Sequence, residues 1–233
     1  MSGRYAVYFA PEPGSDLARF GATWLGYDVA IGRAVAQPPV AGIDPERLHA
    51  ITAEPRRYGF HATLKPPFAL ADGTEAEALA AAVAALANGI VAFTVPRLHL
   101  TRISGFLALT LSESCAAMHD LADRCVSELD GFRALPSASE LERRRRANLS
   151  ARQEALLARW GYPYVMEEFR FHMTLTGRLA AERREELLTM LRQRFATLNL
   201  MSLAIDRIAL FRQADANSRF TVLRHYPLAA ARG

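Results

Sequence analysis

Residues 58–65, Tyr-Gly-Phe-His-Ala-Thr-Leu-Lys, and residues 169–176, Phe-Arg-Phe-His-Met-Thr-Leu-Thr, are two versions of one pattern. In both, a phenylalanine precedes the string His-x-Thr-Leu, and apolar residues alternate with polar ones. Strict alternation over a short run is typical of a β-strand with one face in the core. The sequence therefore predicts two similar strands, each carrying one histidine.

The alternation also predicts which side chains share a face, since successive residues of a strand point to opposite sides. On the first strand, His61 and Thr63 would lie together with Lys65. On the second strand, His172 and Thr174 would lie together. Arg170 and Thr176 complete that second face. Each strand is thus expected to present an imidazole, a hydroxyl and a cation side by side.

The chain around these strands repeats one order of elements: strand, helix, histidine-bearing strand, helix, strand. This order fits residues 4–95 and again residues 105–205. After the first histidine a helix is expected over 74–88 and a strand over 90–95; after the second, a helix over 180–196 and a strand over 200–205. In a pseudo-twofold sheet, equivalent strands lie side by side about the axis. The repeat therefore predicts that the two histidines meet in one site.

Composition indicates a single globular domain of 233 residues, of which 51% are hydrophobic. We expect two lobes, approximately 1–100 and 101–233. The longest apolar stretch, 78–86, is far shorter than the roughly 20 residues of a membrane span, and residues 1–5 lack the order of a signal peptide. The expected location is the cytoplasm, without membrane association.

The two cysteines, Cys115 and Cys125, fall on one predicted helix, where ten residues separate them by about 15 Å. A disulfide cannot span that distance, so both are expected to be free thiols. The chain has no Cys-x-x-Cys pair and no Cys/His cluster. We therefore expect neither a metal site nor a cofactor.

The segment from about 137 to 160 interrupts the repeat and is predicted to be a helical insertion. Ser137 and Glu140 form a capping-box start, and the helix carries Arg143 to Arg146. Two interpretations stay open for these arginines. They can form a solvated surface paired with Glu140 and Glu142, or they can belong to a lid or an RNA-contacting arm. The net charge of +4 is compatible with an anionic partner but does not choose between them.

Two histidines with hydroxyls and cations suit hydrolysis of a phosphodiester. A neutral histidine can remove a proton from the attacking water while a protonated one donates a proton to the leaving oxygen. Threonine hydroxyls and cations can hold the non-bridging oxygens as negative charge develops. One such histidine alone would be read as structural. Two equivalent ones at matching places in a repeat favour a shared catalytic site.

The strings Phe-His-Ala-Thr-Leu at 60–64 and Phe-His-Met-Thr-Leu at 171–175 resemble the paired signature of the 2H phosphoesterase superfamily. That superfamily includes RNA 2′,3′-cyclic phosphodiesterases and 2′-5′ RNA ligase-like proteins. The resemblance implies a duplicated, bilobal α+β fold with antiparallel sheets, a central cleft between the motifs and helices outside. It also implies that the catalytic residues are His61, Thr63, His172 and Thr174.

A longer string at 55–68, together with residues 4–11 and 24–26, resembles a bacterial branch of this superfamily that is associated with phosphonate metabolism. This resemblance implies a small phosphorylated substrate, such as a cyclic ribose phosphate or a nucleotide. The expected substrate-binding residues are Lys65, Arg170, Thr176 and Tyr8. The inserted helix departs from the compact RNA-processing members.

Three functions follow as alternatives. The first is a metal-independent phosphodiesterase, hence a hydrolase, that acts on a small cyclic phosphoribosyl or nucleotide substrate. The second is an RNA 2′,3′-cyclic phosphodiesterase or 2′-5′ RNA ligase-like enzyme with RNA as partner, and the third is a non-catalytic protein that binds a phosphorylated ligand. The sequence does not fix the substrate, the roles of the two histidines as acid and base, or the oligomeric state.

Overall fold

The computed structural model describes residues 3–230 and has an α+β fold. The first half contains β1 (Arg4–Phe9), α1 (Asp16–Leu25), β2 (Tyr27–Asp28), β3 (Arg33–Ala34), α2 (Pro45–Ile51), α3 (Ala53–Arg56), β4 (Ala62–Ala69), α4 (Ala76–Asn88), β5 (Phe93–Pro96) and β6 (Leu98–Ile103). The second half contains β7 (Phe106–Leu111), α5 (Ala116–Glu128), α6 (Ala138–Arg145), α7 (Ala151–Trp160), β8 (His172–Thr174), α8 (Ala181–Ala196), β9 (Ser202–Ile205), β10 (Arg207–Gln213) and β11 (Phe220–Pro227). Short 3₁₀ turns lie at Asp130–Phe132 and Met166–Glu168.

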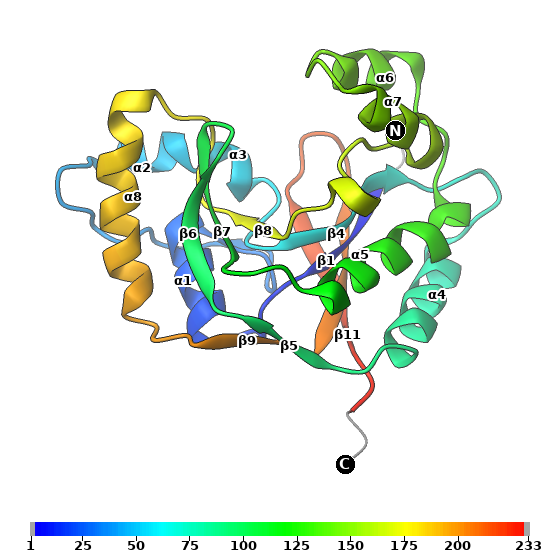
Figure 1. Ribbon diagram of the computed structural model, residues 1–233, viewed down its shortest axis with the longest axis horizontal. Coiled ribbons are helices and arrows are strands. Elements are labelled where there is room, and N and C mark those ends of the chain that lie inside the picture. The colour runs from blue at the N-terminus through cyan, green and yellow to red at the C-terminus, as the bar shows by residue number, and fades with distance from the viewer. Residues whose placement is uncertain (1–2, 231–233) are drawn as a thin grey trace.

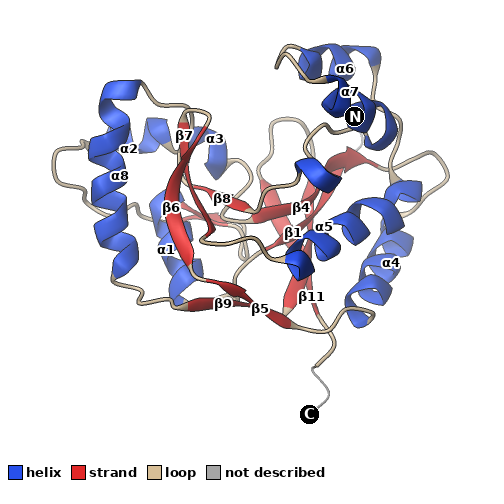
Figure 2. Cartoon of the chain, viewed as in Figure 1, coloured by secondary structure: helices blue, strands red, loops and turns tan. Residues whose placement is uncertain are grey.

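Seven strands form one antiparallel sheet in the order β11-β10-β1-β4-β8-β7-β6. The two histidine-bearing strands, β4 and β8, are neighbours near the middle of this order. The helices lie outside the sheet, with α1 and α8 toward one end and α4 and α5 toward the other (Figures 1 and 2). The predicted fold class, including the central pairing of the two motif strands, is confirmed.

The repeat predicted from the sequence is present in the order of elements. The series β1-α1-β4-α4-β5-β6 corresponds to β7-α5-β8-α8-β9-β10. Equivalent strands pair on the pseudo-twofold axis, β4 with β8 and β5 with β9. The last strand of each series, however, pairs with the first strand of the other, β6 with β7 and β10 with β1. Each half of the sheet therefore contains strands from both of the predicted segments, 1–100 and 101–233.

Two predicted helices lie within two residues of their expected bounds. The helices expected over 74–88 and 180–196 are observed at 76–88 and 181–196. The helix after β1 ends at Leu25, because Gly26 adopts the left-handed conformation with φ of 72°. Residues 27–34 then form the β2-β3 hairpin.

The main hydrophobic core lies between the sheet and the helices. Side chains of β1, β4 and β8 that face it include Val7, Leu64 and Met173, which are almost completely buried. The indole N–H of Trp24, on α1, donates a hydrogen bond of 2.9 Å to the Leu175 carbonyl just after β8. This buried bond ties a helix of the first half to the motif strand of the second.

The insertion at 137–160 forms α6 and α7, which project from one end of the molecule (Figure 1). The Ser137 hydroxyl accepts a hydrogen bond from the Glu140 amide, as the capping pattern predicts. Glu140 pairs with Arg143 and Arg144, and Glu154 of α7 pairs with Arg145. These ion pairs within the insertion agree with the interpretation of a salt-bridged surface.

Across residues 3–230, none of the helices combines the length and the apolar character that a membrane crossing requires.

Candidate active site

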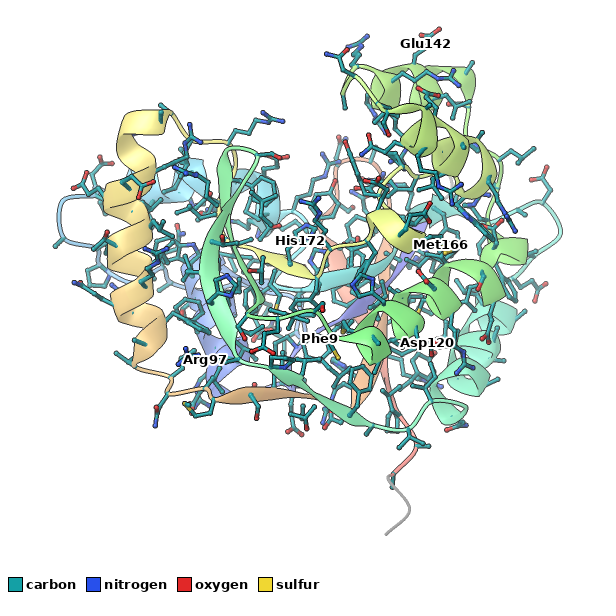
Figure 3. All side chains as sticks on the ribbon, in the orientation of Figure 1. Phe9, Arg97, Asp120, Glu142, Met166 and His172 are labelled. Atoms are coloured by element: carbon teal, nitrogen blue, oxygen red, sulfur yellow. The ribbon has the colours of Figure 1, made fainter. Side chains whose placement is uncertain are left out.

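The histidines of the two motifs come together because Ala62 of β4 pairs with Met173 of β8. His172 begins β8, and His61 immediately precedes β4. In this antiparallel register, Thr63 lies opposite His172, and His61 lies opposite Thr174. The four side chains point to the same side of the sheet, which we call the motif face. Diagonal neighbours in such a pair are about 7–8 Å apart. Figure 3 shows His172 near the middle of the molecule, far from Glu142 at the outer end of the insertion.

Both imidazoles are held in the same way, by the carbonyl two residues earlier in the chain. Nδ1 of His61 lies 2.9 Å from the Gly59 oxygen, and Nδ1 of His172 lies 2.7 Å from the Arg170 oxygen. A carbonyl can only accept a hydrogen bond, so Nδ1 carries the proton in each ring. In the neutral form, the lone pair is therefore on Nε2. Each histidine is prepared to accept a proton there and to donate it later.

Two neighbours fix the position of His61 further. Its Nε2 lies 3.2 Å from the Thr63 hydroxyl, which donates to it when the ring is neutral. On the other side, the ring stacks on Tyr8 with centroids 3.8 Å apart and planes 20° apart. Tyr8 is opposite Thr63 in the pairing of β1 with β4. The His61 ring is thus fixed by one carbonyl, one hydroxyl and one aromatic face.

Gly59 can serve as the carbonyl acceptor because its backbone has a left-handed conformation with φ of 76°. A Cβ atom at this position would lie 2.5 Å from Cβ of Val29. Both the conformation and the close approach require glycine. Glycine is therefore required at position 59 because the backbone there packs closely against the β2-β3 hairpin.

The pKa of each histidine is lowered below its usual value. For His61, burial lowers the pKa to about 4, although the hydrogen bond to the Gly59 carbonyl raises it; the nearby His172 lowers it further. For His172, burial lowers the pKa and the Arg170 carbonyl raises it. Both rings are consequently neutral near pH 7 in the free protein. A bound phosphate anion would raise both pKa values, and one ring could then hold the proton that an acid needs.

The motif face extends beyond the residues that the sequence indicated. Thr110 of β7 pairs with His172, and His99 of β6 pairs with Thr110. The Thr110 hydroxyl lies 3.4 Å from Nε2 of His99. The ring of Phe106 lies 6.0 Å from that of His172, centroid to centroid. Nothing in the sequence placed His99 or Thr110 here, because their position depends on which strands pair.

Lys65 was expected on the motif face, and this prediction was wrong. The strand pairing steps from Val7↔Lys65 to Tyr8↔Thr63, so Leu64 is the extra residue of a β-bulge. The bulge turns Lys65 to the core side, where it is 2% exposed. Its ammonium donates to the Val126 carbonyl at 2.9 Å and lies 3.4 Å from Asp130.

The other three predicted substrate-binding residues are in different environments. Thr176 is fully buried, because the chain leaves the strand after Thr174, and its hydroxyl accepts a hydrogen bond from the Leu107 amide. Tyr8 is 1% exposed beneath His61. Both side chains are therefore almost inaccessible to solvent in the unliganded protein. Arg170 is exposed, and a substrate-binding role for its side chain stays a prediction.

Among the side chains that the structure describes, which exclude those of residues 182 and 183, no three His, Cys, Asp or Glu gather closely enough to form a metal site. Both cysteines are free thiols. The groups on the motif face are the imidazoles of His61, His172 and His99 and three threonine hydroxyls, a set suited to moving protons and to binding phosphate oxygens.

Comparison with known proteins gives relatives for most of the chain. One is a ribose 1,5-bisphosphate phosphokinase PhnN from Janthinobacterium sp. (strain Marseille), 39% identical over 96% of this chain and 50% of the relative. Another protein of that name, from Laribacter hongkongensis (strain HLHK9), is 40% identical over 76% of this chain and 40% of the relative. The chain thus spans at most about half the length of these curated relatives.

Two solved structures are also similar over nearly the whole chain. One is Escherichia coli LigT complexed with 3′-AMP, with a TM-score of 0.47 and 13% identity, covering 98% of this chain and 99% of that one. The other is described as a phosphoesterase, with a TM-score of 0.45 and 15% identity, covering 98% and 99%.

The model of one protein family matches residues 63–221, a range that begins at Thr63 of the first motif and contains the whole of the second. The chain therefore belongs to the family described as "protein of unknown function (DUF1045)".

Proposed function

We propose that this protein is a metal-independent phosphodiesterase that opens a cyclic phosphodiester on a small phosphoribosyl or nucleotide substrate. One observation carries the proposal: two imidazoles lie at the paired central strands β4 and β8, each with Nδ1 held by a carbonyl and with Nε2 as the nitrogen that can accept a proton. A merely structural role would not require two equivalent rings on one partly exposed face.

In the proposed reaction, Nε2 of one histidine takes a proton from water as the water oxygen forms a bond to phosphorus. The bond from phosphorus to the leaving ribose oxygen breaks, and the second histidine donates its proton from Nε2 to that oxygen. The product is a phosphate monoester. Hydroxyl groups of Thr63 and Thr174 donate hydrogen bonds to the non-bridging oxygens as charge develops on them.

Two considerations favour a small ribose phosphate as the substrate. The curated relatives are named for a ribose bisphosphate, although this chain covers only part of them. The sequence also resembles the bacterial branch associated with phosphonate metabolism.

A Gly-x₄-Gly-Lys-Ser/Thr phosphate loop is missing from this chain, whose single lysine follows Leu64. The two histidines and their neighbouring threonines suit hydrolysis of a phosphodiester better than phosphoryl transfer from a nucleotide.

The test is a screen of the purified protein by phosphorus NMR. The panel contains nucleoside 2′,3′-cyclic phosphates, ribosyl 1,2-cyclic phosphates and RNA with a cyclic end, each with and without EDTA. We expect turnover of a small cyclic phosphate that EDTA leaves unchanged. His61→Ala and His172→Ala should each lose about 10²–10⁴-fold in kcat, whereas His119→Ala, on α5, should keep its activity.

Loss of activity in EDTA that an added metal restores would overturn the proposed mechanism. Turnover of RNA ends alone, with affinity that falls steeply between low and moderate salt, would favour the RNA-processing alternative. Binding of the small compounds without any product would favour the non-catalytic alternative.

A further inference from the structure

A group of cationic side chains lies a few residues before the first motif in the chain. A surface pocket of about 270 Å³ is lined by Arg56, Arg57, Arg219 and Asn217, with Ala53 and Ala216. We call it the arginine pocket. Arg56 ends α3, Arg57 follows it, and Arg219 immediately precedes β11. Segments more than 150 residues apart in the sequence therefore bring three guanidinium groups together.

Neutral groups, and not carboxylates, hold these guanidinium groups in place. Arg56 donates to the carbonyls of Leu25 and His49 and to the Thr52 hydroxyl. Arg57 donates to the Ala216 carbonyl, and the Arg219 guanidinium lies over the ring of Tyr27 at 4.9 Å. Within the described part of the chain, none of the three arginines forms an ion pair with Asp or Glu.

The charge in the pocket is consequently not neutralised by the protein. Burial lowers the pKa of Arg56, and the charge of Arg219 lowers it further. The pKa of His49 is lowered first by the neighbouring Arg56 and also by Arg219. The nearby carboxylate of Asp215 bonds within its own turn, to Ser218 and the Asn217 amide. An anion bound in the pocket would relieve the repulsion between guanidinium groups whose positions are already fixed.

The arginine pocket is joined to His61 by an aromatic pair. The Phe220 amide donates to the Arg57 carbonyl at 2.8 Å, so the residues that follow the two arginines, Tyr58 and Phe220, lie together. Their rings stack with centroids 5.3 Å apart, and Tyr58 lies 6.3 Å from His61. Arg57 and His61 are four positions apart in the chain, which limits their Cα distance to about 14 Å.

We propose that the arginine pocket binds a terminal phosphate monoester of the substrate whose cyclic phosphodiester reacts at the histidines. This inference rests on the proposed function and narrows the substrate to a compound with two phosphate groups. A dianionic monoester matches several fixed guanidinium groups better than a singly charged diester does. The short distance from His61 allows one small molecule to reach both sites.

The first experiment measures binding of inorganic phosphate by calorimetry in a His61→Ala/His172→Ala background, which disables the motif face. We expect phosphate to bind there, and to bind at least tenfold more weakly after Arg57→Gln/Arg219→Gln. Arg224→Gln replaces an exposed arginine on β11, the strand that follows Arg219; it is the matched control and should bind as its parent does. Equal phosphate affinity with and without Arg57 and Arg219 would overturn the proposal.

The second experiment compares ligands in the chain with both histidines intact. Adenosine 3′,5′-bisphosphate should bind at least tenfold more tightly than adenosine 3′-monophosphate, and Arg57→Gln/Arg219→Gln should remove that difference. A difference that survives the double substitution would overturn the link between the sites. Neither experiment requires turnover, so failure of the proposed phosphodiesterase activity can be distinguished from failure of this inference. If turnover is found, the double substitution should raise KM only for substrates with the terminal phosphate.

Discussion

The imidazole of His61 stacks on the phenol ring of Tyr8 across neighbouring strands, with ring centroids 3.8 Å apart and planes 20° apart. Tyr8 is 1% exposed, and among the side chains that the structure describes its hydroxyl has no hydrogen-bond partner. Burial is the first cause of its raised pKa, so the phenol stays protonated. The aromatic face of Tyr8, and not its hydroxyl, therefore supports the histidine.

This relationship predicts different results for two substitutions of Tyr8. Tyr8→Phe keeps the stacked ring, so kcat and KM should stay within about twofold of the parent values. Tyr8→Leu removes the flat surface behind His61; kcat should fall at least tenfold, and stability should fall by roughly 2–4 kcal/mol from the cavity. For both variants, steady-state kinetics measure kcat and KM, and urea unfolding measures the free energy of unfolding. A KM that rises in Tyr8→Phe with kcat unchanged would instead show that the hydroxyl contacts the substrate.

Gly59→Ala should destabilise the protein by roughly 2–4 kcal/mol, because it adds left-handed strain and a clash with Val29. The Gly59 carbonyl should also shift away from Nδ1 of His61, and kcat of the folded protein should fall. Gly73→Ala is a matched control: Gly73 has a φ of 78°, but nothing lies within 4 Å of an added Cβ. The difference in unfolding free energy between the two variants measures the clash. Equal losses would show that Val29 does not restrict this site.

The lowered pKa of His61, about 4 in the folded chain, predicts a stability change between pH 6.5 and pH 4. In this range the unfolded chain binds the proton and the folded chain does not, so the free energy of unfolding rises with pH. Acidification from pH 6.5 to 4 should therefore cost on the order of 2 kcal/mol through His61. His61→Asn should show a smaller loss over the same range when both proteins are unfolded with urea. Parallel pH profiles for the two proteins would contradict the low pKa.

Lys65→Met should reduce stability while the folded protein keeps its kinetic constants. The substitution removes the hydrogen bond to the Val126 carbonyl and one partner of Asp130, which keeps its ion pair with Arg133 at 2.8 Å. A loss of about 1–3 kcal/mol is expected for breaking such a buried contact. Urea unfolding and steady-state kinetics on the same preparations test this. A raised KM without loss of stability would restore the role in substrate binding that the sequence suggested.

The sequence predicted the central features of the site because they depend on local patterns. Strand alternation placed His61 with Thr63 and His172 with Thr174, and the repeated order of elements brought the two strings to neighbouring strands. Alternation failed at Lys65, because the bulge at Leu64 is set by the pairing of β4 with β1. Pro66 and Pro67 directly follow this bulge, and proline inside a sheet marks bulges or edges, so the sequence carried a signal that alternation alone does not use.

The residues that sequence reasoning missed depend on which strands pair. Thr110 joins the motif face only because β7 lies beside β8, and His99 only because β6 lies beside β7. Similarly, the arginine pocket needs β11 beside the end of α3. Hydrophobic periodicity predicts that a strand exists and which face is buried, but it does not specify a partner that is distant in the sequence.

The last strand of each half pairs with the first strand of the other half, and this arrangement affects how the chain folds. The backbone of β1 is hydrogen-bonded along both edges only when β10, about 200 residues later, pairs with the edge that β4 leaves free. Until residues 207–213 leave the ribosome, the first strand of a nascent chain has an unpaired edge that can bind other strands. The order of synthesis therefore opposes early folding of the N-terminal half. Production of residues 1–100 alone should yield an aggregating fragment, while release of the full chain allows both halves to close together.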